Sequence, residues 1–284
     1  MRKYRGFIKA SFLEVFAFRF DIWSWIVQDI LTVICTVFLW LAIYAQQDSG
    51  VSISGYKEAE LIGYMVFISL SLTWSGATNT FRNVGDDIYQ GNIANSLTKP
   101  IHYRRWQFFN AIGQMLANFT LFFLPMLVVS ALFLQLIFAS NGGLGAIFSS
   151  FSWWNVPFYL IARLLALVIT DSLDFIIAQL SFLTKSVFGL MIIKSTIFAF
   201  LSGGMIPFSF FPKGVQEALA YLPFASLAST PVNLLLGRYS LTSSVPLQNA
   251  WFVLGLSALY AIALYAASEM ACAKMIRHVE SAGG

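Results

Sequence analysis

The residues of this sequence that could do chemistry are charged side chains inside apolar runs. Asp171 and Asp174 lie three residues apart, so a helix would present both on one face, and Arg163, eight residues before Asp171, lies close to that face. Lys194 follows a short connection and lies about as far beyond it as Asp174 lies before it. A helical hairpin would bring Lys194 to the depth of Asp174, where opposite charges should pair because each alone in lipid is costly.

This intramembrane charged group has three possible roles: an ion pair that only fastens two helices, a polar wall of a substrate path, or a proton-coupling site. The sequence contains none of the common nucleotide-binding and catalytic motifs GxxxxGK[ST], GxGxxG, HExxH, GxSxG and CxxC. Its two histidines, His102 and His278, lie at the rims of apolar runs. We therefore expect no enzyme activity, no metal site and no cofactor bound by this chain.

The elements that must position the charged group are membrane helices. Of the 284 residues, 58% are hydrophobic and 11% are charged, and the mean hydropathy is +0.74. Charge is costly at bilayer depth, so this composition predicts an all-α membrane protein with one transmembrane domain over residues 1–284. Six runs approach or exceed the ~20 residues needed to cross a bilayer. They are Ile22–Tyr44, Leu61–Thr80, Phe108–Phe138, Trp154–Leu183, Ser186–Ile206 and Ala250–Ala271.

The distribution of lysine and arginine predicts the orientation. With the N-terminus inside, the outer connections hold Lys57, Lys213 and Arg238, whereas the other basic residues of the connections lie inside. We therefore expect both termini in the cytoplasm. The net charge of +4 reflects this asymmetry and does not indicate a nucleic-acid partner, because the basic residues flank apolar runs.

Three segments complete the predicted architecture. Residues 82–105, the longest polar stretch between two apolar runs, predict a cytoplasmic loop with about one short helix. Residues 207–247 stay apolar but are interrupted by prolines, which favours a pair of re-entrant outer half-helices over a plain interfacial loop. Residues 1–20 predict an interfacial amphipathic helix, with a frayed basic tail as the alternative. The apolar face of that helix would carry, at four-residue spacing, Ile8, Phe12, Phe16 and Phe20.

Two parts of the chain carry a resemblance to a known family. The first part, in residues 82–105, consists of Asp87, Ile88, Gly91, Leu97 and the pair Lys99-Pro100. The second consists of SGGMIPFSFFP at 202–212 and LPFASLASTPVNLLLG at 222–237. In this order and spacing the chain resembles the ABC-2 type exporter permeases, which are membrane subunits of ATP-binding cassette transporters, and it is most similar to the small six-span drug or peptide exporters.

The resemblance implies a bacterial inner-membrane subunit that pairs with a second permease, identical or related, with a related one favoured. It also implies two ABC ATPase subunits that bind ATP and Mg. The polar loop would hold a coupling helix that docks on the ATPase, with Ile88, Ile93 and Leu97 as its apolar anchor. That role is carried over to Asp86, Asp87, Ile88, Tyr89, Gly91, Ile93 and Leu97. An outer gate is expected at Pro207, Phe208, Phe210, Phe211 and Phe224.

The function expected from this resemblance is ATP-driven export of a hydrophobic or amphipathic substrate, such as a drug, a peptide or a lipid-like molecule. One alternative is an ion-coupled secondary transporter that uses Asp171, Asp174 and Lys194 and transports without an ATPase. Another is a non-transporting membrane partner whose polar loop binds a soluble protein. Nucleotide-dependent movement of the outer segment would distinguish the exporter from this second alternative.

Overall fold

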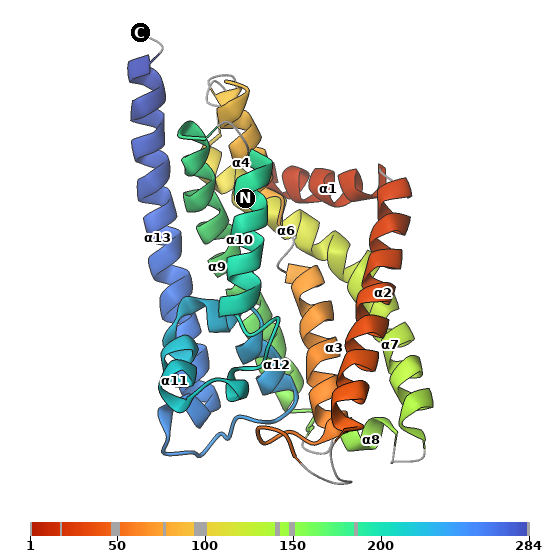
Figure 1. The fold of residues 1–284 in the computed structure, drawn as a ribbon. Helices are drawn as coiled ribbons and strands as arrows, with labels where there is room; N and C mark the ends of the chain where they lie inside the picture. Colours follow the sequence, from red (N-terminus) through yellow and green to blue (C-terminus); the bar gives the residue numbers. More distant parts are fainter. Residues whose placement is uncertain are drawn as a thin grey trace.

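The computed structural model describes residues 2–17, 19–46, 52–75, 78–93, 101–139, 143–147, 151–184 and 187–282. Across these ranges the chain is helical, with isolated β-bridges between Ile53 and Tyr56 and between Ser240 and Asn249 as its only β pairings. Long helices lie side by side in a bundle, and the first helix lies across them (Figure 1). The described chain therefore confirms the all-α class.

The helices of the bundle have the following bounds. They are α1 Arg2–Ala17, α2 Arg19–Tyr44, α3 Glu58–Ser75, α4 Thr80–Tyr89, α6 Tyr103–Asn118, α7 Leu124–Ile137, α8 Leu144–Ile147, α9 Asn155–Ala178, α10 Val187–Leu201, α11 Lys213–Tyr221, α12 Ser229–Leu235 and α13 Ala250–Ala282.

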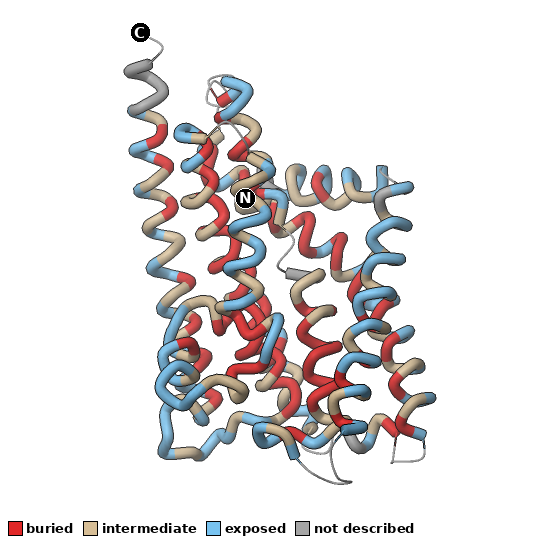
Figure 2. The backbone as a smooth tube through the Cα atoms, viewed as in Figure 1, coloured by how far each residue is buried: buried red, intermediate tan, exposed pale blue. Residues whose placement is uncertain are grey.

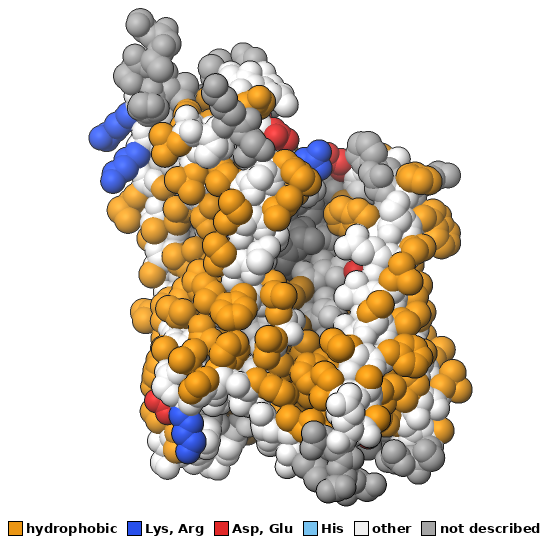
Figure 3. Space-filling view, viewed as in Figure 1, with side chains coloured by type: hydrophobic (Ala, Val, Ile, Leu, Met, Phe, Trp, Pro, Cys, Tyr) orange, Lys and Arg blue, Asp and Glu red, His pale blue; other side chains and the backbone are white. Residues whose placement is uncertain are grey.

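Three segments of the described chain are long and apolar enough to cross a membrane: Ile22–Tyr44, Tyr103–Ile137 and Ala250–Arg277. Helix α10 is apolar, but its 15 residues reach only ~22 Å, which is less than the ~30 Å of a hydrocarbon core. Charged side chains on the visible face gather near the two ends, with apolar side chains between them (Figure 3). The membrane class is therefore supported by three spans, while the full set of six remains a prediction.

Several predicted spans have different boundaries in the structure, and the second and third differ as follows. The run expected to span from Leu61 to Thr80 ends as a helix at Ser75, and Thr80 begins the separate helix α4. The helix is interrupted next to the point where the hydroxyls of Thr78 and Thr80 donate hydrogen bonds to carboxylates of α9. The third predicted span begins at Tyr103, five residues earlier than expected, because Tyr103, Arg104 and Gln107 are buried in the bundle.

A change of helix type lies within the third span. Residues Phe119–Phe123 form a π-helical turn between α6 and α7, and Pro125 follows in the first turn of α7. Proline has no N–H to donate and its ring crowds the preceding turn, so a wider turn before it relieves the clash. Helix α6 is inclined to α7 (Figure 1), and a π-bulge next to a proline is a sufficient cause of such a bend.

Helix α1 is fixed against α6. Ser11 donates a hydrogen bond to Asn110 at 2.8 Å, and Gly113 lies so close to α1 that a Cβ there would be 2.5 Å from the carbonyl oxygen of Ile8. This contact holds α1 across the bundle rather than along it (Figure 1). A helix is therefore present where an amphipathic one was predicted.

The main core surrounds α3 and the buried helix α12. Every residue from Leu61 to Ile68 is buried, so α3 is enclosed on all sides over two turns (Figure 2). In the segment predicted as two re-entrant half-helices, α12 is buried along most of its length, whereas α11 buries Leu219 alone. The structure thus encloses one of the two short helices and leaves the other on the surface.

Candidate functional site

Four charged side chains from three helices meet inside the bundle. Asp171 and Asp174 of α9 are fully buried, as is Arg104 of α6, and the side chain of Lys194 on α10 is 11% exposed. The two carboxylates form separate ion pairs, Asp171 with Arg104 and Asp174 with Lys194. We call these four residues the charged network.

The ion pair between Asp174 and Lys194 joins α9 to α10, as the sequence predicted. Lys194 Nζ donates to Asp174 Oδ1 at 2.8 Å, and Thr78 Oγ1 donates to Oδ2 at 3.0 Å. The ammonium also lies over the rings of Phe81 and Phe198, 5.1 and 5.5 Å from their centroids. The aromatic faces and the carboxylate together compensate for the water that the ammonium has lost.

The second pair, between Asp171 and Arg104, was not predicted. Arg104 Nη1 lies 2.7 Å from Asp171 Oδ2, and Thr80 Oγ1 donates to Oδ1 at 2.6 Å. The guanidinium also donates to Ser268 at 2.7 Å and to Ser172 at 3.2 Å. Placing Arg104 in a cytoplasmic loop was therefore wrong, because its side chain lies inside the bundle and ties α6, α9 and α13 together.

The sequence did contain a signal for the burial of Arg104. On α6 the polar residues Arg104, Gln107, Gln114 and Asn118 follow each other at helical spacings, and all are buried. A polar stripe that faces inward has to find partners within the bundle. The prediction of one polar loop over residues 82–105 obscured this stripe. Its first member, Arg104, was assigned to the loop together with its exposed neighbour Arg105.

Each carboxylate of the network bonds to one cation and one threonine. Burying an ion pair costs several kcal/mol per ion and is repaid only when the remaining oxygen atoms are also hydrogen-bonded. Both threonines belong to the segment that leads into α4, since Thr80 is its first residue and Thr78 lies two residues before it. The network therefore holds the beginning of α4 against α9.

Arg163 does not join this network, contrary to the predicted polar stripe. Its side chain is fully buried and donates to the backbone carbonyls of Leu227, at 2.7 Å, and of Ser71. Eight residues separate it from Asp171, which is ~12 Å along a helix. Arg163 instead ties α9 to α3 and to the turn between α11 and α12.

The segment predicted to be the coupling helix is a helix that begins and ends earlier than expected. Helix α4 ends at Tyr89, and Gly91 follows with a φ of +71°, which terminates the helix at low steric cost. Ile88 and Ile93 are 8% and 4% exposed and pack into this chain's own core. They are therefore not available as the predicted apolar anchor for a partner, and Leu97 lies outside the described residues.

The exposed part of this segment is its tip. Tyr89 is 57% exposed, and the three residues after it, 90–92, are exposed as well. Asp87 accepts a hydrogen bond from Tyr103 at 2.8 Å, and Asp86 lies 3.7 Å from Arg82. The body of α4 packs closely, because a Cβ on Gly85 would be 2.8 Å from the side chain of Val187.

The residues predicted to form an outer gate contact several helices. Phe208 is buried and packs with Phe211, and Pro207 is buried beside it. Phe210 lies 5.5 Å from Trp40 of α2, between ring centroids, and Phe224 lies 5.2 Å from a phenylalanine of α10. These aromatic side chains thus seal the outer segment against α2 and α10.

Arg238, in the loop after α12, contacts residues at the start of α3. The guanidinium of Arg238 stacks 3.4 Å from the ring centroid of Tyr56, and its Nη2 lies 3.2 Å from the carboxylate of Glu60. Burial raises the pKa of Tyr56, and it raises the pKa of Tyr239 to about 12, so both phenols are neutral at ordinary pH. These contacts of Arg238 hold the loop after α12 against the start of α3.

The comparisons with known proteins give the family. A family model described as ABC-2 family transporter protein matches residues 30–283. The chain is a member of this ABC-2 family. Neither the curated proteins nor the solved structures to which it was compared include a match.

As an ABC-2 protein, the chain is a transmembrane permease of an ABC transporter. The match covers the charged network, α4 and the outer segment, and it begins within α2. Helix α1 lies before the matched region. The charged network is thus part of a transport protein.

Proposed function

We propose that this ABC-2 permease is the membrane subunit of an ATP-driven exporter, with α4 as the element through which the ATPase acts. The observation that carries the proposal is that α4 has an exposed tip and a buried root. The tip, Tyr89 and residues 90–92, is free to meet a partner, while the root is bonded to Asp171 through Thr80. Force on the tip would therefore reach α9.

The packing of α4 supports rigid transmission. Its buried face contacts α9, the turn after α9 and α10, and close approach at Gly85 leaves no room for an independent swing. Packed elements of this kind move as units between discrete arrangements. ATP would shift the permease only by favouring one of these arrangements, so a docked tip is required for coupling.

We propose that two ABC ATPase subunits and a second permease complete the transporter, with a related permease favoured over an identical one. The exposure of α10 supports a partner at this helix, because none of its described residues is buried in the single chain (Figure 2). Figure 3 shows a hollow between the part of the molecule that carries α10 and the part that carries α2. A second permease facing this hollow would close it into a path.

The remaining parts of the proposal concern orientation and substrate. We propose that the end with both termini, which has the excess of basic residues, faces the cytoplasm of a bacterial-type cell, and that the chain crosses the inner membrane with six spans in all. The substrate is a hydrophobic or amphipathic molecule, since the surfaces that flank the hollow are rich in apolar side chains (Figure 3). ATP and Mg would bind to the ATPase subunits.

The ion-coupled alternative is less well supported. A carboxylate that carries protons through a transport cycle needs access to water, but Asp171 and Asp174 are fully buried and each bonds to a cation and a threonine. This alternative requires transport by the purified chain in the absence of an ATPase. A non-transporting partner protein would leave the outer segment unchanged when nucleotide is added.

The test is co-purification with the ATPase, using one substitution at the tip. Tyr89→Ala should weaken binding of the ATPase by at least tenfold, since an exposed tyrosine at an interface commonly contributes ~2 kcal/mol or more. Tyr221→Ala, at an exposed tyrosine of α11 at the other end of the molecule, is the matched control and should leave binding intact. Full retention of the ATPase by Tyr89→Ala and by a Gly91-to-Asn92 deletion would contradict the proposal.

A further inference from the structure

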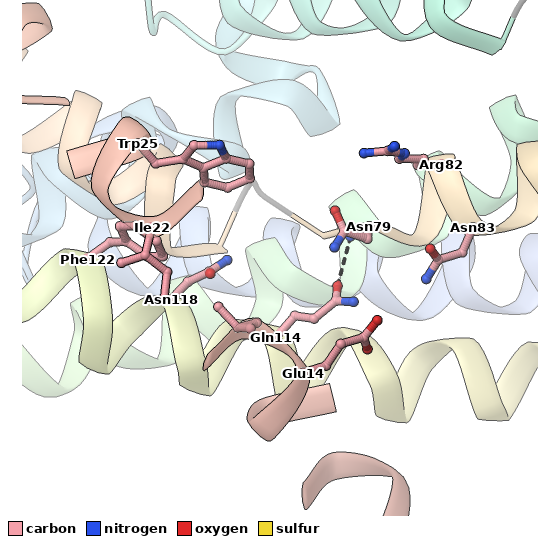
Figure 4. A pocket seen from close by; sticks show the side chains of 10 residues that line it. Glu14, Ile22, Trp25, Asn79, Arg82, Asn83, Gln114, Asn118 and Phe122 are labelled. Atoms are coloured by element: carbon pink, nitrogen blue, oxygen red, sulfur yellow. Dashed lines mark hydrogen bonds between the residues drawn. The ribbon is translucent and has the colours of Figure 1, made fainter. Parts of the chain in front are cut away.

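A cavity of about 380 Å³ lies where α1 crosses the bundle. Its walls come from α1, α2, the start of α4, α6 and the π-helical turn (Figure 4). The charged network and the exposed tip of α4 do not line it. The volume is near the lower end of the roughly 300–1,000 Å³ typical of small-molecule sites.

One wall of the cavity is made of carboxamides. Gln114 and Asn118 are each 5% exposed, and Asn79 and Asn83 face the same space (Figure 4). Gln114 Oε1 accepts the backbone N–H of Asn79 at 2.8 Å, which fixes the amide so that its NH₂ group is left to donate elsewhere. The NH₂ group of Gln114 therefore suits this wall to a ligand with hydrogen-bond acceptors.

The opposite wall is apolar. Ile22 and Trp25 of α2 face Phe122, and the rings of Trp25 and Phe122 lie 5.9 Å apart between centroids (Figure 4). An aliphatic chain can pack against such a wall while a polar group bonds to the amides. The cavity is therefore amphipathic in the same sense as a membrane lipid.

Opposite charges complete the lining. Glu14 reaches the cavity from α1 and Arg82 from α4 (Figure 4). Arg82 has only a long contact of 3.7 Å with Asp86, and 72% of its side chain is exposed, so it can turn to an anion at little cost. A ligand that carries both a cation and an anion would meet a complementary group for each.

We propose that this cavity binds the headgroup of a zwitterionic phospholipid from the leaflet next to α1. The ammonium group lies at Glu14, the phosphate at Arg82 and the ester carbonyls at the donor amide of Gln114. An acyl chain leaves across Trp25. Helix α1, which lies across the bundle as an interfacial helix does, sets the cavity at headgroup depth. The bound lipid would join α1 to the start of α4 without any requirement for ATP.

The test is native mass spectrometry of the whole chain released from nanodiscs that contain equal parts of phosphatidylethanolamine and phosphatidylglycerol. One phosphatidylethanolamine should stay bound after the other lipids have been stripped. Glu14→Gln should lower its retention relative to phosphatidylglycerol by about tenfold, the factor that corresponds to ~1.4 kcal/mol. Arg82→Gln should lower the retention of both lipids together.

A matched control keeps the test decisive. Glu217→Gln makes the same change at an exposed position of α11, outside the cavity, and should alter nothing. Glu14 is exposed, so its variant should fold normally, and the test does not depend on the buried Gln114. Equal retention of both lipids by the unmodified chain, no effect of Glu14→Gln, or retention of a different amphiphile in their place would overturn the proposal. None of these results bears on ATPase docking, because no ATPase is present.

Discussion

The ion pair between Asp174 and Lys194 allows a quantitative prediction. Asp174 is fully buried and the side chain of Lys194 is 11% exposed, so removing either charge leaves the other without its partner in a poorly solvated site. Breaking a buried pair in this way costs about 3–5 kcal/mol. We expect ~3 kcal/mol for each of Asp174→Asn and Lys194→Met, because Asn keeps an acceptor for Thr78 and Met keeps the stem that packs on Phe81.

The double variant distinguishes a real pair from two independent buried polar groups. With both charges gone, no uncompensated ion is left, so the double variant should be more stable than either single variant. The coupling free energy should therefore exceed ~3 kcal/mol, roughly 150-fold in the unfolding equilibrium. The measurement is unfolding by SDS in detergent micelles, followed by far-UV circular dichroism.

A second double-mutant cycle, with Asp174 and a distant lysine, provides the control. Lys274→Met removes an exposed lysine of α13, and its effect should add to that of Asp174→Asn, since the two sites share no contact. If the double variant of Asp174 and Lys194 proves no more stable than the single variants, the two residues are not paired and the reasoning about matched depth fails.

Two further substitutions test the packing around the network. Arg104→Lys should lower the free energy of unfolding by ~2 kcal/mol, because the carboxylate and the two serines each contact a different nitrogen of the guanidinium and a lysine has one nitrogen. Unchanged stability would show that the extra hydrogen bonds contribute nothing. Gly113→Ala should cost ~1–3 kcal/mol by pushing α1 off α6, since its Cβ would lie 2.5 Å from the carbonyl oxygen of Ile8. The control Gly6→Ala, which meets nothing within 4 Å, should be neutral or stabilising, and equal effects of the two alanines in the same unfolding assay would contradict the close contact.

The pairing of Asp174 with Lys194 could be predicted because it needs only two facts from the sequence. Charges are costly in apolar spans, and two antiparallel helices with a short connection bring residues equally distant from it to one depth. The geometry of the hairpin then leaves few other partners. The structure confirms the predicted pair, since the two side chains form a hydrogen bond of 2.8 Å.

Arg104, Ile88 and Ile93 show what the sequence left undecided. Their positions depend on how α4 and α6 pack against α9 and α13, which are distant in sequence. An apolar residue on a short polar segment can face a partner or its own chain, and no local pattern tells these apart. Similarly, Arg104 and Arg105 look alike in sequence, yet one is fully buried and the other pairs loosely with Glu269 at 3.9 Å.

The most direct test of the central claim is photo-crosslinking from the tip of α4. A photo-reactive amino acid at Gln90, which is exposed, should crosslink to the ATPase in assembled transporter, and the yield should change when ATP is added. The same amino acid at Gln216 on α11, at the other end of the molecule, is the control and should give no crosslink to the ATPase. A crosslink from Gln216, or none from Gln90 in a transporter that hydrolyses ATP and exports its substrate, would contradict the account.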